Sequence, residues 1–438
     1  MSEADVSTLS QSARRCAGRL RQGRWPALLL LATVLASTAH GVESAVEAGG
    51  KRTDAVILDP ERVPSLEGLI RAGLERSAHG DLAGAERYWA QIREYHPDHP
   101  AGPLFEMQTL EARKSLDYQD DHYDAQLRAK AEEAITLSEE WLERAPDDPQ
   151  AHFYAGQAKV EMMIVAGVAG QYYKAGTIGE QGRKHLERAL ELDPDLVDAK
   201  LPLGSYHYYT AIATRFIRLF SWLWFVPTGD RETGLAYIEE VSRKGDLYRF
   251  DASAQLANIL LYMEDAPERA APILERLHRT HPESGYLAFE VVELKMIEGD
   301  YAGTVEKALE LEQSHGSQFG DATRRTMAKI WRARAELHRG HPERTRAILA
   351  EIDASGQDLS GWCRRWMLLT RGNLEDLLDR RDEAVEYYED VVALESRWQS
   401  GRSVELARQL LETPFRLDAA AQPPFVSASP PGAPPARN

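Results

Sequence analysis

Histidine pairs are the residues of this sequence whose spacing most resembles a chemical site. His96–His99 and His278–His281 both read His-x-x-His, and two histidines at this spacing on a helix can bind one metal ion. His96 and His99, however, flank Pro97, and no His-Glu-x-x-His motif is present. The second pair ends directly before a proline, where a helix is expected to stop. Both pairs therefore favour turns and helix ends, and we expect no metal site.

Other patterns of catalytic residues are missing from the sequence. It contains no G-x-S-x-G motif, phosphate-binding loop or dinucleotide fingerprint. Acidic pairs such as Glu239-Glu240 and Asp120-Asp121 are adjacent, so on a helix their carboxylates do not face each other. Of the two cysteines, Cys16 lies in a segment that we expect to be removed, and Cys363 is expected to be buried and structural. We expect a non-enzymatic protein without a cofactor.

A period of 34 residues organises most of the chain. Residues 66–99 carry a small residue near position 8, glycine near 15, alanine near 20, an aromatic residue near 24 and proline near 32. These residues are Gly73, Gly80, Ala85, Trp89 and Pro97. Small residues at positions 8 and 20 allow two helices of a hairpin to approach closely, and glycine permits the turn between them. Proline ends the second helix.

The same register continues along the chain with interruptions. Its later structural positions are Gly156, Pro194, Gly204, Ala270, Pro282, Gly372 and Ala384. Between residues 100 and 250 the spacing is stretched, and 165–179 is the expected insertion of the third repeat. The first helix of the fourth repeat is expected to extend through 221–225, and a last helix over 403–411 is expected to cover the stack.

This pattern resembles the tetratricopeptide repeat (TPR) superfamily over about four-fifths of the chain. The resemblance implies an all-α fold, a right-handed α-solenoid of about eight TPR-like helical hairpins with insertions in repeats two to four. The expected organisation is a signal peptide (1–41), a flexible linker (42–63), the solenoid (64–412) and a disordered Pro/Ala-rich tail (413–438). A repeat pattern of this kind specifies a fold and says little about function.

The resemblance also implies a binding surface, because the first helix of each TPR hairpin lines the concave face. The register assigns to this face aromatic, Met, Gln and Glu residues of repeats three to six. The candidates are Phe153, Gln157, Tyr208, Tyr209, Gln255, Tyr262, Met263, Phe289 and Glu293. Such residues suit an extended or helical peptide. The alternative is that the superhelix or its insertions fill this groove, so that the same residues form the core.

The N-terminal segment has the pattern of a signal peptide. Five arginines precede the apolar run 27–36, and small residues follow it. Cys16 lies before the apolar run, so a lipobox is absent, and an uncleaved anchor is the alternative. We expect a periplasmic or secreted protein from a bacterium. The formal net charge of −17 disfavours nucleic acid as a partner, because phosphate backbones are repelled.

The segment 206–225 is the most apolar part of the chain outside this N-terminal run, and Arg215 and Arg218 interrupt it. One interpretation is an extended helix that packs on the neighbouring repeat. The other is a flap carrying Phe220, Trp222 and Trp224 that touches a membrane surface or a partner. Substituting both tryptophans by serine distinguishes the two, because only a membrane contact would lose association with liposomes.

Two functional hypotheses remain from the sequence. The first is an exported scaffold that binds a protein or peptide segment through its concave face. The second is a small-molecule-binding accessory protein of a transport system, with an aromatic pocket in repeats three to five. An enclosed apolar cavity of several hundred cubic ångströms near Tyr208, Tyr209 and Tyr262 would favour the second. The partner and the oligomeric state do not follow from the sequence.

Overall fold

The computed structural model describes residues 64–114, 122–217, 229–314, 320–394 and 402–417, and these contain helices, turns and coil but no strand. The helices of the first four repeats are α3 (Leu66–Ala78), α4 (Leu82–Tyr95), α5 (Ala101–Lys114), α6 (Asp124–Arg144), α7 (Pro149–Val168), α8 (Tyr172–Leu192), α9 (Lys200–Ile217) and α10 (Arg231–Lys244). Those that follow are α11 (Arg249–Tyr262), α12 (Pro267–Thr280), α13 (Gly285–Ile297), α14 (Tyr301–Gln313), α15 (Asp321–His338), α16 (Pro342–Ala354), α17 (Gly361–Leu377), α18 (Arg381–Ala393) and α19 (Arg402–Glu412).

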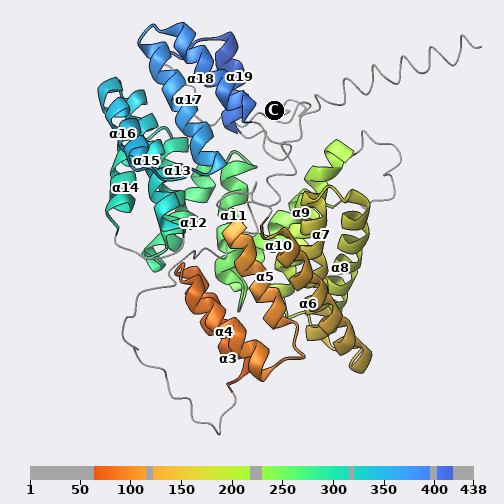
Figure 1. Cartoon of the computed structure of the whole chain (residues 1–438). Coiled ribbons are helices and arrows are strands. Elements are labelled where there is room, and N and C mark those ends of the chain that lie inside the picture. Colours follow the sequence, from red (N-terminus) through yellow and green to blue (C-terminus); the bar gives the residue numbers. More distant parts are fainter. Residues whose placement is uncertain (1–63, 115–121, 218–228, 315–319, 395–401, 418–438) are drawn as a thin grey trace, which may run out of the picture.

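Consecutive helices pair into eight hairpins, from α3–α4 to α17–α18, and α19 packs against the last pair (Figure 1). The predicted all-α solenoid of about eight hairpins is therefore confirmed, as is the closing helix. The resemblance to TPR proteins is confirmed at the level of the fold. Within the described ranges, no helix is long and apolar enough to cross a membrane.

The close approach at position 8 is visible at both ends of the solenoid. A Cβ atom added to Gly73 would lie 2.2 Å from the Trp89 ring, and one added to Gly372 would lie 2.4 Å from the Tyr388 ring. Each of these aromatic residues stands at position 24 of its repeat. The large ring therefore fills the space that the missing side chain leaves, and both rings are almost fully buried. Position 20 is equally tight, since Ala85, Ala270 and Ala384 are all 0% exposed.

In hairpins one, five, six, seven and eight, the inner turn places a residue in the left-handed region near position 15. Gly80, Gly299 and Gly340 have φ values of 80°, 73° and 77°. Asp265 and Asp379 take the same place with φ values of 52° and 57°. Asp is among the few non-glycine residues that tolerate this conformation, so the same turn forms in the repeats that have Asp at this position.

Proline marks the end of a second helix, as the sequence predicts. Pro97, Pro146, Pro194 and Pro282 each follow the last helical residue by two positions, after α4, α6, α8 and α12. A residue that precedes proline disfavours the helical conformation, which explains why each helix stops before this point.

The extra residues of repeats two and three lengthen helices. Helices α6, α7 and α8 have 21, 20 and 21 residues, whereas α3 and α4 have 13 and 14. The predicted insertion 165–179 ends α7, forms a turn with Gly170 at φ 73°, and begins α8. It is thus a helical extension of the hairpin. Helix α9 of repeat four is also long, at 18 residues.

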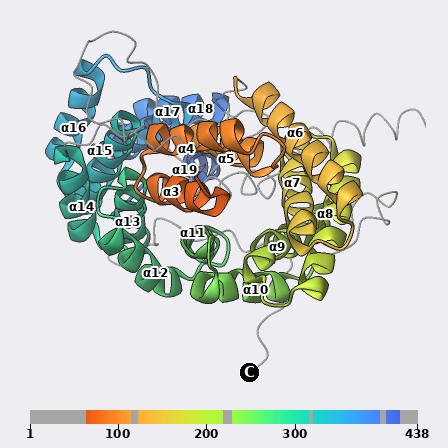
Figure 2. The same ribbon diagram turned by 90° about the horizontal axis from the view of Figure 1, so that it is seen from below.

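The first hairpin returns to lie beside repeats five and six (Figure 2). The Arg71 guanidinium of α3 pairs with Asp246, and the His79 and His281 rings meet edge to face at 4.9 Å. From the second hairpin, the Phe105 ring of α5 lies 6.5 Å from that of Tyr248. One hydrophobic core runs without interruption from α3 to α13. The early repeats therefore form a closed arrangement in which inner residues pack on one another.

Several predictions fall on residues outside the described ranges. These are the signal peptide (1–41), the whole linker (42–63), the flap residues Phe220, Trp222 and Trp224, and the tail from 418 onward. The described coil continues past the predicted solenoid boundary at 412, since the Phe415 N–H donates to Asp376 at 2.7 Å. Cys363 is buried, as expected.

Substitution of Gly73 by alanine tests the close approach in repeat one. The new methyl group would collide with Trp89, and such overpacking costs about 1–3 kcal/mol. We expect a lower melting temperature and urea midpoint, measured by far-UV circular dichroism. The matched control is Gly167→Ala, because its added Cβ meets nothing within 4 Å. The free energy of unfolding of this control should be unchanged or higher by about 0.5–1 kcal/mol, because alanine is favoured over glycine inside a helix. Equal unfolding of the Gly73 variant and the wild type would contradict the packing described here.

Candidate functional site

The residues that the register assigned to a concave face do lie on the first helices of repeats three to six, but most are buried. Exposure is below 9% for Phe153, Gln157, Tyr208, Tyr209, Gln255, Phe289 and Glu293. Tyr262 and Met263, at the end of α11, are half-buried. These side chains thus make most of their contacts within the protein, and their role in binding a partner stays a prediction.

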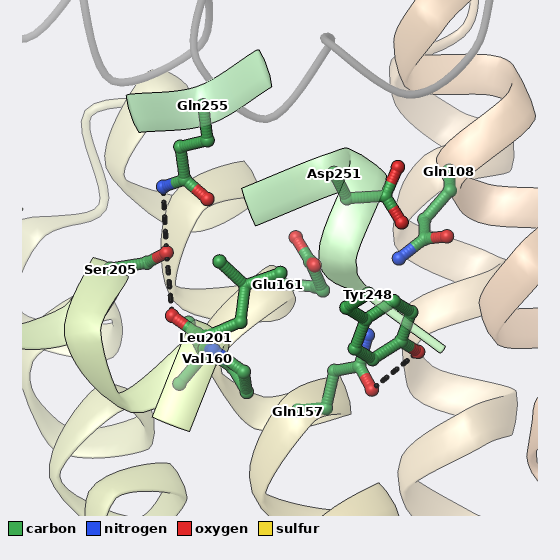
Figure 3. A pocket seen from close by; sticks show the side chains of 10 residues that line it. Gln108, Gln157, Val160, Glu161, Leu201, Ser205, Tyr248, Asp251 and Gln255 are labelled. Carbon is green, nitrogen blue, oxygen red and sulfur yellow. Dashed lines mark hydrogen bonds between the residues drawn. The ribbon is translucent and has the colours of Figure 1, made fainter. Parts of the chain in front are cut away.

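A small polar cavity lies among the inner helices α5, α7, α9 and α11 (Figure 3). Its volume is about 30 Å³, which is space for one or two water molecules. Most of its lining residues are polar: Gln108, Gln157, Glu161, Ser205, Asp251 and Gln255, with Tyr248, Val160, Leu201 and Pro202 completing the wall. It is much smaller than the cavity that a drug-sized apolar ligand would need.

Hydrogen bonds fix several groups of this wall. The Tyr248 hydroxyl donates to Gln157 Oε1 at 3.1 Å, and Gln255 Nε2 donates to Ser205 Oγ at 2.8 Å (Figure 3). Ser205 in turn donates to the Leu201 carbonyl at 3.0 Å. Gln157 and Gln255, two of the predicted lining residues, are thereby brought to opposite parts of one cavity. Their side chains are held in place before any partner arrives.

Asp198 positions the segment that brings Tyr248 into the wall. Its carboxylate accepts the backbone N–H groups of Asp246, Leu247 and Tyr248 at 3.1, 2.9 and 3.2 Å. These bonds hold the turn between α10 and α11 against the start of α9. Asp198 thus has hydrogen-bond partners for its negative charge, and it raises the pKa of the neighbouring Asp251.

Two other carboxyl groups, those of Glu161 and Asp251, line the cavity itself. Among the described residues, Glu161 Oε2 is buried and has no hydrogen-bond partner. Burial raises the pKa of Glu161 and, with the charge of Asp198, raises that of Asp251 to about 7. Burial and the charge of Glu161 likewise raise the pKa of Glu111 on α5. The ammonium group of Lys159, also on α7, pairs with Glu139 and therefore does not serve as a counter-charge for Glu161.

A second acidic cluster joins α11 and α13. The Tyr262 hydroxyl lies 2.9 Å from Glu290 Oε2 and 2.7 Å from Glu293 Oε2, and it has one proton to donate to the two. Burial raises the pKa of both carboxyl groups, and the charge of Glu293 raises that of Glu290 further. Two of the predicted residues, Tyr262 and Glu293, therefore do meet, in a proton-sharing cluster on the inner face.

The register did not select Gln108, Tyr248, Asp251 or Glu290. Gln108 comes from repeat two, whose stretched spacing hid its register, and Tyr248 lies in a turn before α11. Glu290 could have been found, because it stands three residues before Glu293 and so on the same face of one helix.

Comparison of the chain with known proteins finds only weak structural similarity. No protein-family model matches the chain, and comparison with curated proteins finds no relative. Among solved structures, a human IFIT1 dimer with m7Gppp-AAAA matches at 13% identity over 78% of this chain and 70% of that chain, with a TM-score of 0.40. A tetratricopeptide repeat protein from Parabacteroides merdae ATCC 43184 matches at 14% identity over 79% and 97%, with a TM-score of 0.21. At these values neither structure carries an argument about function.

The acidic cluster predicts that stability falls as the pH rises. The folded-state pKa values of Glu290 and Glu293 lie above the ordinary value of 4.5, so the folded protein holds protons that the unfolded chain releases. The contribution of these two carboxyl groups to the free energy of unfolding is complete below about pH 4.5. It is lost as the pH rises through their raised pKa values. In Glu290→Gln/Glu293→Gln, urea unfolding between about pH 5 and about pH 8 should lose less stability than the wild type, by more than about 1 kcal/mol.

The control for this experiment is Glu268→Gln, a change of an exposed carboxylate on α12. Its unfolding should follow the wild-type pH profile. A double variant with the same pH slope as the wild type would show that the two carboxyl groups do not take up protons on folding.

Proposed function

We propose that this protein is a non-enzymatic helical-repeat scaffold that binds a protein segment through its inner face, and that a basic group of that segment enters the polar cavity. The basic group is an ammonium or guanidinium head, from a lysine, an arginine or a free amino terminus. The observation that carries the proposal is the Glu161 carboxylate, whose Oε2 is buried at the cavity without a hydrogen-bond partner among the described residues.

The chemistry of the wall supports a cation. Glu161 and Asp251 supply carboxylates, and Gln108, Gln157, Ser205 and Gln255 supply oxygen atoms that can accept a hydrogen bond. A buried carboxylate without a counter-charge is costly, and it is relieved by a proton or by a hydrogen-bonded cation. The volume of about 30 Å³ admits the head group of a side chain but no larger ligand. An ammonium group therefore fits both the size and the charge of the site.

The proposal includes export, which the N-terminal sequence pattern supports. The negative net charge of the chain also suits a basic partner segment and disfavours nucleic acid. The alternative function, an accessory protein with an aromatic pocket for an apolar ligand, gains no support from the cavity described here. The cavity is small, six of its ten lining residues are polar, and Tyr208, Tyr209 and Tyr262 do not line it.

A selection of random peptides displayed on phage tests the proposed chemistry. On the full chain, the selected peptides should be enriched in Lys or Arg at one fixed position. For Glu161→Gln the binding of a selected peptide should weaken by about ten- to a hundredfold, because a hydrogen bond to a charged group contributes about 1.5–3 kcal/mol. Fluorescence polarisation of the labelled peptide gives this affinity. Replacement of its basic residue by norleucine should cause a loss of the same order.

The matched control is Glu140→Gln, which removes an exposed carboxylate from α6 and should leave the affinity unchanged. Glu161→Gln itself should fold, since it replaces an unpaired buried acid with a neutral group of the same shape, and circular dichroism checks this. Selected peptides without a basic residue, or equal affinity for the Glu161 variant, would overturn the proposal.

A further inference from the structure

A histidine of the first hairpin meets a histidine of the fifth where the solenoid closes on itself. His79 is the C-terminal cap of α3, and His281 is the C-terminal cap of α12. One ring nitrogen of each and a carboxylate oxygen of Glu75 all lie within 4.8 Å of one another. The two rings meet edge to face with centroids 4.9 Å apart. Three residues of metal-binding types thus converge from distant parts of the sequence.

The main chain sets the protonation of both rings. His79 Nδ1 lies 2.8 Å from the Glu75 carbonyl, and His281 Nδ1 lies 3.2 Å from the Leu277 carbonyl. A carbonyl oxygen only accepts hydrogen bonds, so both contacts favour the tautomer with the proton on Nδ1 and the lone pair on Nε2. The Thr280 hydroxyl, 2.8 Å from His281 Nδ1, can accept from the same proton. A backbone carbonyl behind the far nitrogen is the usual support of a histidine that binds a metal.

A further carboxylate faces one of these lone pairs. Glu283 Oε2 is 3.9 Å from His79 Nε2. A lone pair and a carboxylate at this distance repel each other unless a positive charge is between or on them. That charge is either a proton on the imidazole or a metal ion that both groups bind. Glu75 and Glu283 have side-chain exposures of 68% and 63%, so an ion can reach them from solvent.

We propose that Glu75, His79 and His281 bind one divalent transition-metal ion of the zinc class, with Glu283 or water as the fourth ligand. Two imidazoles and one or two carboxylates form a ligand set that suits zinc. The ion ties the end of α3 to the turn between α12 and α13. It thereby reinforces the contact that the Arg71–Asp246 ion pair makes at the same closure.

The sequence led us to expect no metal site, and the histidine pair proposed here is neither of its two His-x-x-His motifs. His278 and His281 share a His-x-x-His motif, but the partner of His281 here is His79, from another repeat. Neither histidine motif of the sequence contains His79. The register cannot show this pairing, since it depends on how far the superhelix turns over four repeats. None of its residues lines the polar cavity, so the proposed metal site does not depend on the proposed function.

Isothermal titration of the full chain with zinc sulfate tests the site. The wild type should bind one zinc ion per chain at this site, and His79→Gln and His281→Gln should each weaken its affinity by at least about tenfold. Two controls are matched: His278→Gln, on the same helix, and His185→Gln, which removes the close His152–His185 pair. Both should bind zinc as the wild type does. Loss of zinc binding in a control but not in the His79 and His281 variants would overturn the assignment.

Hydrogen–deuterium exchange of the same proteins tests the effect on closure. Zinc should slow amide exchange in α3 and in α12 of the wild type, and a chelator should reverse the effect. His281→Gln should show no zinc-dependent protection. Zinc binding that leaves the exchange of α3 unchanged would refute a metal tie between the first and fifth repeats.

Discussion

The structure depends on how closely the two helices of each hairpin approach. In repeats one and eight a glycine on the first helix faces a large aromatic ring on the second, and nothing larger than hydrogen fits between them. In repeats three and four the approach is of backbone on backbone: a Cβ added to Gly156 would lie 3.0 Å from the Gly182 carbonyl, and one added to Gly204 would lie 2.9 Å from that of Gly234. Hairpins this close stack on one another, and the solenoid turns until its first hairpin meets its fifth.

That closure explains why inner residues can be both polar and buried. Once α3 and α5 lie beside the start of α11, the wall of the cavity receives side chains from four repeats. The longer helices α6, α7 and α8 extend this part of the stack. Of these three, α7 carries the lining residues Gln157, Val160 and Glu161, and α6 and α8 pack beside it.

The fold was predictable because each of its requirements falls on a single residue. A glycine at position 8, a residue that tolerates positive φ at position 15 and a proline beyond the second helix can all be read one repeat at a time, as Gly73, Gly80 and Pro97 show. The site was less predictable because it depends on contacts between repeats. The register placed Gln157 and Gln255 on the inner face, but only the turn of the superhelix decides that Tyr248 and Gln108 join them, or that His79 reaches His281.

The acidic groups in and around the cavity are distinguished by what neutralises them. Asp198 has three backbone N–H donors, and the exposed Glu139 on α6 has the Lys159 ammonium. Glu290 and Glu293 share one tyrosine hydroxyl, and burial raises the pKa of both carboxyl groups. Glu161 Oε2 has no hydrogen-bond partner among the described residues. Since burial of an unpaired carboxylate is costly, a fold gains nothing in stability from it, and a wall of fixed amides around it gives it a binding geometry. A positively charged group from outside the fold is the partner that satisfies both the charge and the geometry.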